Sequence, residues 1–201
     1  MTADTWPTPA DLGDWNDFLV AFYLTDGRNA FDIAAVWEGM DAAKKEQIIS
    51  DYHAAGKKIR VSLFGATDMP LKHGGDPVAI GKQISQFVKD NMLDGVDVDY
   101  EDSESFNAAG DGENFLITLT KTLREELPAP YVISHAPQSP YFTTAGWYPQ
   151  GAYNKVHAEV GSMIGTFVCA RLSCVRPTHP VDRRFYLLRL YSWNSLLTYA
   201  C

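Results

Sequence analysis

Hydrophobic residues recur at two spacings along this chain, and the change of spacing predicts strands that alternate with helices. Short apolar runs bounded by turn residues are typical of buried strands, and four such runs cover residues 17–24, 58–65, 93–101 and 131–136. Apolar residues three and four positions apart predict helices over 41–55, from Asp76-Pro77 onward, over 113–127 and over 153–164. The predicted order is a strand and then a helix, repeated four times.

This order predicts a parallel sheet, which is either a closed barrel or an open, doubly wound sheet. The third strand helps to decide between them, because Asp97, Asp99 and Glu101 are two residues apart and share one face. Both faces of an open sheet lie under helices, which leaves a row of acids without polar surroundings. The interior face of a barrel instead reaches a ligand-binding mouth at the carboxyl ends of the strands. We therefore expect an α/β protein with barrel-type packing.

The acidic strand is also the main chemical signal. Its three carboxylates lie about 6.6 Å apart along the strand, so they cannot all ionise cheaply away from water, and at least one should keep its proton. Enzymes that cleave glycosidic bonds typically use a protonated carboxyl group beside an ionised one. A calcium-binding loop is excluded, because counting from Asp97 or from Asp99 never places Gly sixth and Glu twelfth.

Charge and composition narrow the set of partners. The formal net charge of −8 argues against nucleic acid or an anionic membrane as partner, and no apolar run is long enough to span a bilayer. Residues 1–10 lack the features of a secretory signal, which leaves a secreted or a cytoplasmic location open. Residues 1–164 hold 24 acidic and 12 basic residues, whereas residues 165–201 hold 1 and 5. This change marks a boundary near residue 164.

Residues 94–101 read Asp-Gly-Val-Asp-Val-Asp-Tyr-Glu, which matches D-G-x-D-x-D-x-E, the pattern of glycoside hydrolase family 18, at every fixed position. Val61-Ser62-Leu63-Phe64-Gly65 resembles the S-x-G-G strand of that family, with Phe64 in place of the first Gly. Residues 134–141 resemble its A-P-Q segment. The chain thus resembles family 18, the chitinases and endo-β-N-acetylglucosaminidases, over about residues 18–164.

The resemblance implies a partial TIM (β/α)8 barrel that holds strands two to five of eight, and a complete barrel typically needs about 250 residues. It also implies hydrolysis of β-1,4-linked N-acetylglucosamine, in chitin or in the N-glycan core, by substrate-assisted retention. Glu101 would protonate the leaving oxygen, and repulsion along the row would keep it able to do so. Asp99 would accept a hydrogen bond from the acetamido N–H, and Asp97 would share a proton with Asp99.

Further site residues follow from the same resemblance. Gln138, Tyr141 and Phe64 are the expected substrate contacts, although packing within the loop explains Tyr141 equally well. No cofactor and no metal are expected, since Cys169, Cys174 and Cys201 lack the spacing and the His partners of a metal site. His135 is expected to be a hydrogen-bonded core residue. Asp94 is expected to act with Gly95 at the start of the strand.

The sequence also departs from the family after Ile164. The strand that would supply a tyrosine to the reacting acetamido group does not follow. We therefore predict a partial catalytic barrel over 1–164 and a poorly structured, non-family tail over 165–201. Two alternatives to an active enzyme stay open, namely an inactive fragment and a non-catalytic carbohydrate-binding relative.

Overall fold

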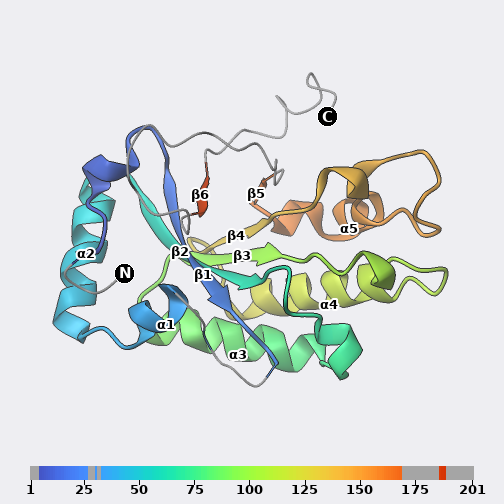
Figure 1. Ribbon diagram of the computed structural model, residues 1–201, viewed down its shortest axis with the longest axis horizontal. Helices are drawn as coiled ribbons and strands as arrows, with labels where there is room; N and C mark the ends of the chain where they lie inside the picture. Colours follow the sequence, from blue (N-terminus) through green and yellow to red (C-terminus); the bar gives the residue numbers. More distant parts are fainter. Residues whose placement is uncertain (1–4, 27–29, 31–32, 169–185, 189–201) are drawn as a thin grey trace.

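The computed structural model describes residues 5–26, 30, 33–168 and 186–188, in which strands and helices alternate (Figure 1). The strands are β1 (Asp17–Tyr23), β2 (Lys58–Phe64), β3 (Gly95–Asp99), β4 (Val132–His135), β5 (Thr166–Phe167) and β6 (Tyr186–Leu188). The α-helices are α1 (Ile33–Glu38), α2 (Ala42–Ala54), α3 (Pro77–Asp90), α4 (Asp111–Glu126) and α5 (Tyr153–Val160). None of the helices in this described part combines the length and the apolar character needed to cross a membrane.

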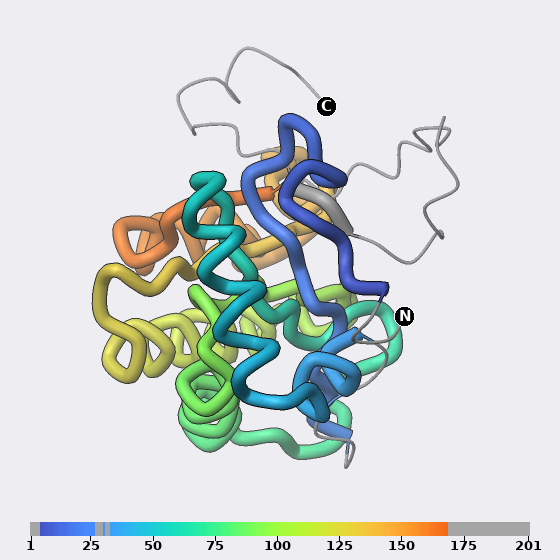
Figure 2. Tube along the Cα trace, turned by 90° about the vertical axis from the view of Figure 1, so that its left-hand side faces the viewer, coloured from blue at the N-terminus to red at the C-terminus, as the bar shows by residue number. Residues whose placement is uncertain are grey.

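The strands form one sheet in the order β5-β4-β3-β2-β1-β6. The pairs from β1 to β5 are parallel, whereas β6 pairs with β1 in the antiparallel direction. Consecutive parallel strands lie side by side with helices between them, which confirms the expected fold class of a partial (β/α)8 barrel. Figure 2 shows α2 on the viewer's side of the strands, and Figure 1 shows α3 and α4 next to one another beneath the sheet.

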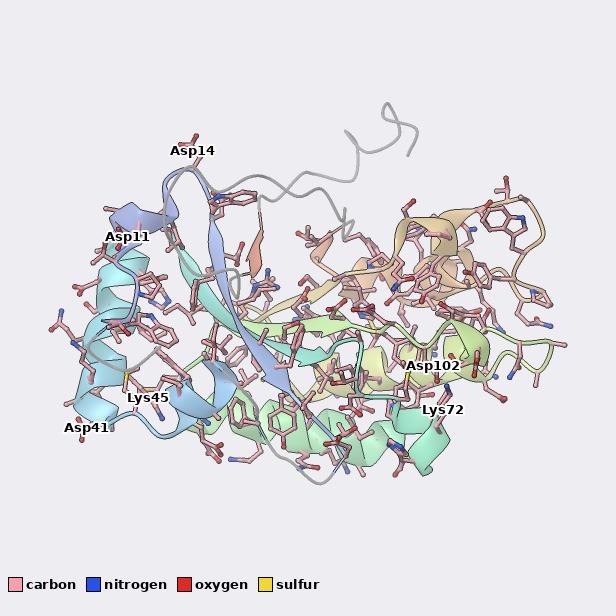
Figure 3. The ribbon with its side chains drawn as sticks, in the orientation of Figure 1. Asp11, Asp14, Asp41, Lys45, Lys72 and Asp102 are labelled. Carbon is pink, nitrogen blue, oxygen red and sulfur yellow. The ribbon has the colours of Figure 1, made fainter. Side chains whose placement is uncertain are left out.

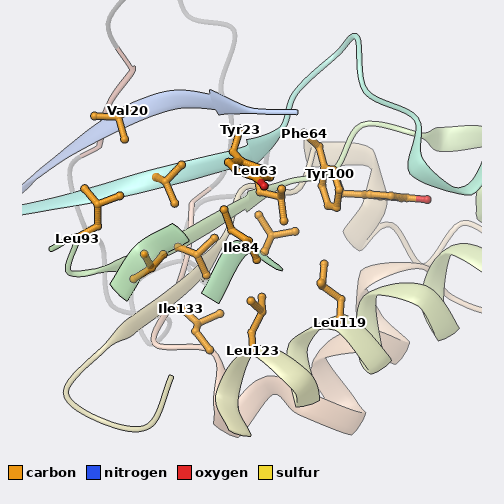
Figure 4. Packing of buried hydrophobic residues seen from close by; sticks show 14 of the residues in the cluster. Val20, Tyr23, Leu63, Phe64, Ile84, Leu93, Tyr100, Leu119, Leu123 and Ile133 are labelled. Carbon is orange, nitrogen blue, oxygen red and sulfur yellow. The ribbon is translucent and has the colours of Figure 1, made fainter. Parts of the chain in front are cut away.

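The two faces of the sheet differ in polarity because strand side chains alternate. One face packs against α3 and α4 through fully buried apolar residues, among them Leu63, Ile133, Ile84 and Leu123 (Figure 4). The opposite face carries polar residues in register, since Ser62 of β2 is opposite Asp97 of β3, and Asp97 is opposite Ser134 of β4. The helices therefore cover the outside of the barrel, and the acids line its interior.

Several elements differ from the sequence expectation. Helix α1 and strands β5 and β6 were not predicted, because each is too short to show a periodic pattern. The helix predicted over 153–164 ends at Val160 and continues as the 3-10 helix η6 (Gly161–Met163). Within the predicted tail, β5 and β6 are strands, while residues 169–185 and 189–201 lie outside the described residues. The boundary at residue 164 stays a prediction.

Phe64 at the end of β2 lies in the helix-facing core, away from the acids. Its φ of 80° is in the left-handed region, where a side chain other than that of Gly is strained. This backbone conformation turns the ring outward, where it packs against Tyr100 and Phe115 with centroids 5.7 and 6.1 Å apart. The ring is fully buried (Figure 4). The Phe64 ring is therefore not among the groups that line the barrel interior.

We expect Phe64→Gly to be less destabilising than Phe64→Ala, by about 0.5–1 kcal/mol, although both lose the buried ring at a cost of about 3–5 kcal/mol. Glycine relieves the strain of a positive φ, and alanine keeps it. Urea unfolding of both variants measures the difference. Phe18 is equally buried in β1 without a positive φ, so at this control position we expect the opposite order, with Ala more stable than Gly. If Gly and Ala variants had the same order of stability at both positions, strain at the positive φ of Phe64 would not explain the result.

Candidate active site

The acids of β3 form a row that runs from the buried interior toward the surface. The Asp97 residue is 1% exposed and Asp99 is 7% exposed, whereas Glu101, just beyond the carboxyl end of the strand, is partly exposed. Alternation along the strand places Asp97 and Asp99 on the same face. The carboxyl end of a barrel strand is where (β/α)8 enzymes place catalytic groups. The row is thus positioned to present Glu101 at the barrel mouth.

Asp97 is held by hydroxyl groups from both neighbouring strands. Ser62 of β2 donates to Asp97 Oδ2 over 3.2 Å, and Ser134 of β4 donates to Asp97 Oδ1. Burial raises the pKa of Asp97, while the Arg60 guanidinium and the two serine hydroxyls oppose this rise because they stabilise the charged form. Asp97 is consequently a rigid anchor at the inner end of the row.

Asp99 has no such donors among the described residues, and its environment favours the neutral acid. Burial, and then the negative charges of Asp97 and Glu101, raise the pKa of Asp99 to about 8. Asp99 thus keeps its proton at neutral pH. This agrees with the expectation that at least one acid of the row stays protonated, and it favours the middle acid.

We expect Asp99→Asn to stabilise the protein at alkaline pH. A folded-state pKa of about 8, against 3.8 for an unperturbed aspartate, means that the folded state binds more protons than the unfolded state between these values. Stability is therefore lost as the pH rises from 4 to 8. The variant cannot ionise, so its advantage in unfolding free energy grows from little at pH 4.5 to as much as about 5 kcal/mol at pH 8.5.

Urea unfolding of both proteins at pH 4.5 and pH 8.5 measures this difference. The exposed Asp14 provides the matched control (Figure 3), because Asp14→Asn should change stability by no more than about 0.5 kcal/mol at either pH. If the gain in unfolding free energy of Asp99→Asn were the same at both pH values, the pKa of Asp99 would not be raised by its surroundings.

Glu101 makes one contact that the sequence did not predict. Gln138 Nε2 donates to Glu101 Oε2 over 2.9 Å. Gln138 directly precedes the 3-10 helix η5 (Ser139–Phe142), which follows β4. The loop after β4 thereby orients the carboxyl group at the end of β3. The structure brings Gln138 to the site, and its contact with substrate stays a prediction.

Tyr141 packs between its own loop, the segment after β3 and helix α5. It is fully buried, its hydroxyl is 2.7 Å from Ser103 Oγ, and its ring stacks on Tyr153 with centroids 6.0 Å apart. Burial raises the pKa of the Tyr141 hydroxyl to about 12. Of the two explanations for Tyr141, the structure supports packing within the loop.

Asp94, the first acid of the motif, has a structural role at the start of β3. Asp94 Oδ2 accepts a hydrogen bond from the Ile59 N–H over 2.8 Å, and Asp94 Oδ1 lies 2.7 Å from His53 Nε2. Asp94 therefore joins the starts of β2 and β3. His135 is a hydrogen-bonded core residue, as expected, because its ring nitrogens each lie 3.1 Å from the hydroxyls of Thr120 and Tyr153. Burial lowers the pKa of His135 to about 3, so the ring is neutral.

Sequence reasoning missed Arg60 and Ser134 as members of the site. Arg60 is fully buried in β2, and it donates to Ser134 Oγ. One signal was available, since an arginine two positions before Ser62 shares its face in an otherwise apolar strand. No group of three or more His, Cys, Asp or Glu residues in the described ranges has the arrangement of a metal site.

Known structures resemble this fold. A family 18 chitinase from Pseudoalteromonas aurantia is 33% identical, with a TM-score of 0.64 over 76% of this chain and 58% of its own. A family 18 chitinase from Chromobacterium violaceum is 20% identical, with a TM-score of 0.62 over 81% and 45%. A fungal family 18 endo-β-N-acetylglucosaminidase is 15% identical, with a TM-score of 0.50 over 77% and 55%.

Comparison with family models found no match, and comparison with curated proteins found none. The chain spans 58% or less of the length of these three solved structures. Its parallel strands, its helical exterior and its acids at the carboxyl end of β3 define a partial β/α barrel of the kind found in these structures. The 33% identity to the Pseudoalteromonas aurantia chitinase, over 76% of this chain, extends the likeness from the fold to the sequence and supports glycoside hydrolase family 18.

Proposed function

We propose that this chain carries the catalytic acids of an enzyme that hydrolyses β-1,4-linked N-acetylglucosamine, in chitin or in the N-glycan core. The observation that carries the proposal is the row of acids itself: Asp97 is buried, burial and neighbouring charges raise the pKa of Asp99 to about 8, and Glu101 is partly exposed. The solved relatives, which are chitinases and an endo-β-N-acetylglucosaminidase, support this class of substrate.

The proposed mechanism is substrate-assisted retention, in which the sugar's own acetamido oxygen attacks the anomeric carbon. Glu101 gives its proton to the leaving glycosidic oxygen and later takes a proton from the incoming water. Asp99 accepts a hydrogen bond from the acetamido N–H through its carbonyl oxygen, and the dipole of this group stabilises the positive ring that forms. Asp97 remains inside the barrel and supports Asp99. Gln138 holds the Glu101 carboxyl group in the orientation needed for proton transfer.

The test is to incubate the full chain with chitooligosaccharides and, separately, with a glycoprotein that bears N-glycans. We expect release of new reducing ends, and proton NMR of the first product should show the β-anomer, because the mechanism retains configuration. Cleavage of only one substrate assigns the enzyme to chitin or to N-glycans. Binding of oligosaccharide without any cleavage would identify a carbohydrate-binding relative and would overturn the proposal of hydrolysis.

A further inference from the structure

A buried ion pair lies at the inner end of the acid row. Arg60 is fully buried and Asp17 of β1 is 1% exposed, and Arg60 Nε donates to Asp17 Oδ1 over 2.9 Å. Arg60 Nη2 and Asp17 Oδ2 are also buried, and neither has a hydrogen-bond partner among the described residues. A buried pair with unsatisfied atoms is weak evidence for stability, because desolvation of the charges is costly.

The hydrogen bonds that leave this pair have a fixed direction. A guanidinium can only donate, so the 2.5 Å contact from Arg60 Nη1 makes Ser134 Oγ the acceptor. The single proton of the Ser134 hydroxyl is then free to be donated to Asp97 Oδ1. Ser62 donates to the other oxygen, Asp97 Oδ2. Both oxygens of Asp97 therefore accept hydrogen bonds, which is the pattern of an ionised carboxylate.

We propose that Arg60 is a positioning residue for the acid pair, because through Ser134 it keeps Asp97 ionised and fixed, so that the proton shared by the pair stays on Asp99. The effect of Arg60 on catalysis rests on the proposed function, whereas its effect on the ionisation of Asp97 does not. Without the charge of Arg60, the preference of the proton for Asp99 over Asp97 would weaken, and Asp99 would carry it for only part of the time.

The other charges around the pair favour protonated over ionised acids. Asp17 from β1 raises the pKa of Asp97, and the charges of Asp97 and Glu101 act on Asp99 from the same strand. Burial, and then the charges of Asp99 and Asp97, raise the pKa of the Tyr153 hydroxyl of α5. Among the described residues that act on Asp97, Arg60 supplies the positive charge. Its loss should therefore move the proton toward Asp97.

The test is a carboxyl-carbon NMR titration of the full chain, which needs no turnover. Ser134→Ala interrupts the relay and leaves the ion pair of Arg60 and Asp17 in place, so it should fold. We expect the Asp97 carboxyl carbon to titrate about 1 pH unit higher in Ser134→Ala, and about 1–3 units higher in Arg60→Met if that variant folds. Ser134→Thr keeps a hydroxyl group and should restore the wild-type titration.

Ser85 is the matched control, because it is a fully buried serine of α3 remote from the acids. Ser85→Ala should leave the titration of Asp97 unchanged. An unchanged Asp97 titration in Ser134→Ala, or an equal shift in Ser85→Ala, would overturn the inference. If the Asp97 titration shifts but the chain has no glycosidase activity, the relay is supported and hydrolysis is refuted. If the chain cleaves its substrate but the titration does not shift, hydrolysis is supported and the relay is refuted.

Discussion

Glu101→Gln should lower kcat on chitooligosaccharides by about 10²- to 10⁴-fold, which is the range that a positioned general acid contributes. Glutamine matches glutamate in size and can still bond to Gln138, but it cannot release a proton to the leaving oxygen. The side chain is partly exposed at the carboxyl end of β3, so its loss as an acid should not disturb the core. Initial rates of reducing-end release, together with the unfolding midpoint, separate lost chemistry from lost folding.

The matched control is the same substitution three residues further on. The Glu104 side chain is 83% exposed and pairs over 3.0 Å with Lys72, which Figure 3 labels. Glu104→Gln should leave kcat within about twofold of wild type, because exposed ion pairs contribute little. Full activity of Glu101→Gln would remove Glu101 from its assigned role, and it would leave the fold and the family unaffected.

Gly95→Ala should prevent stable folding, with a loss of unfolding free energy above about 4 kcal/mol. A Cβ atom at Gly95 would lie 1.9 Å from the carbonyl oxygen of Val132, which is its register partner on β4. The φ of Gly95 is also 150°, which residues with a side chain rarely adopt. The strands β3 and β4 would have to separate, and with them Asp97 and Ser134. Circular dichroism and urea unfolding measure the loss.

Gly56 provides the control for this prediction. It also has a positive φ, of 69°, but an added Cβ would meet no atom within 4 Å. Gly56→Ala should cost only about 1 kcal/mol, from backbone strain alone. If the two variants were equally stable, the contact with Val132 would not be the reason for Gly95, and the glycine of the motif would need another explanation.

The strands that build the site could be predicted because their signals are local. Alternation of acids with Val96, Val98 and Tyr100 is sufficient to place the acids on one face of β3. Short elements such as α1 and β5 lacked a readable period, so they were missed. Family resemblance also led to Phe64 and Tyr141 as substrate contacts, and the structure buries both rings in apolar packing.

The sequence by itself determined the order of strands and helices, the face that carries the acids and the family to which they point, because each depends on residues close together in the chain. Tertiary structure alone decided which acid keeps its proton and what holds the pair in place. Arg60 and Ser134 are 74 residues apart, and they meet only because β2 and β4 flank β3. Burial and neighbouring charge are properties of the assembled barrel interior, and no local pattern of residues contains them.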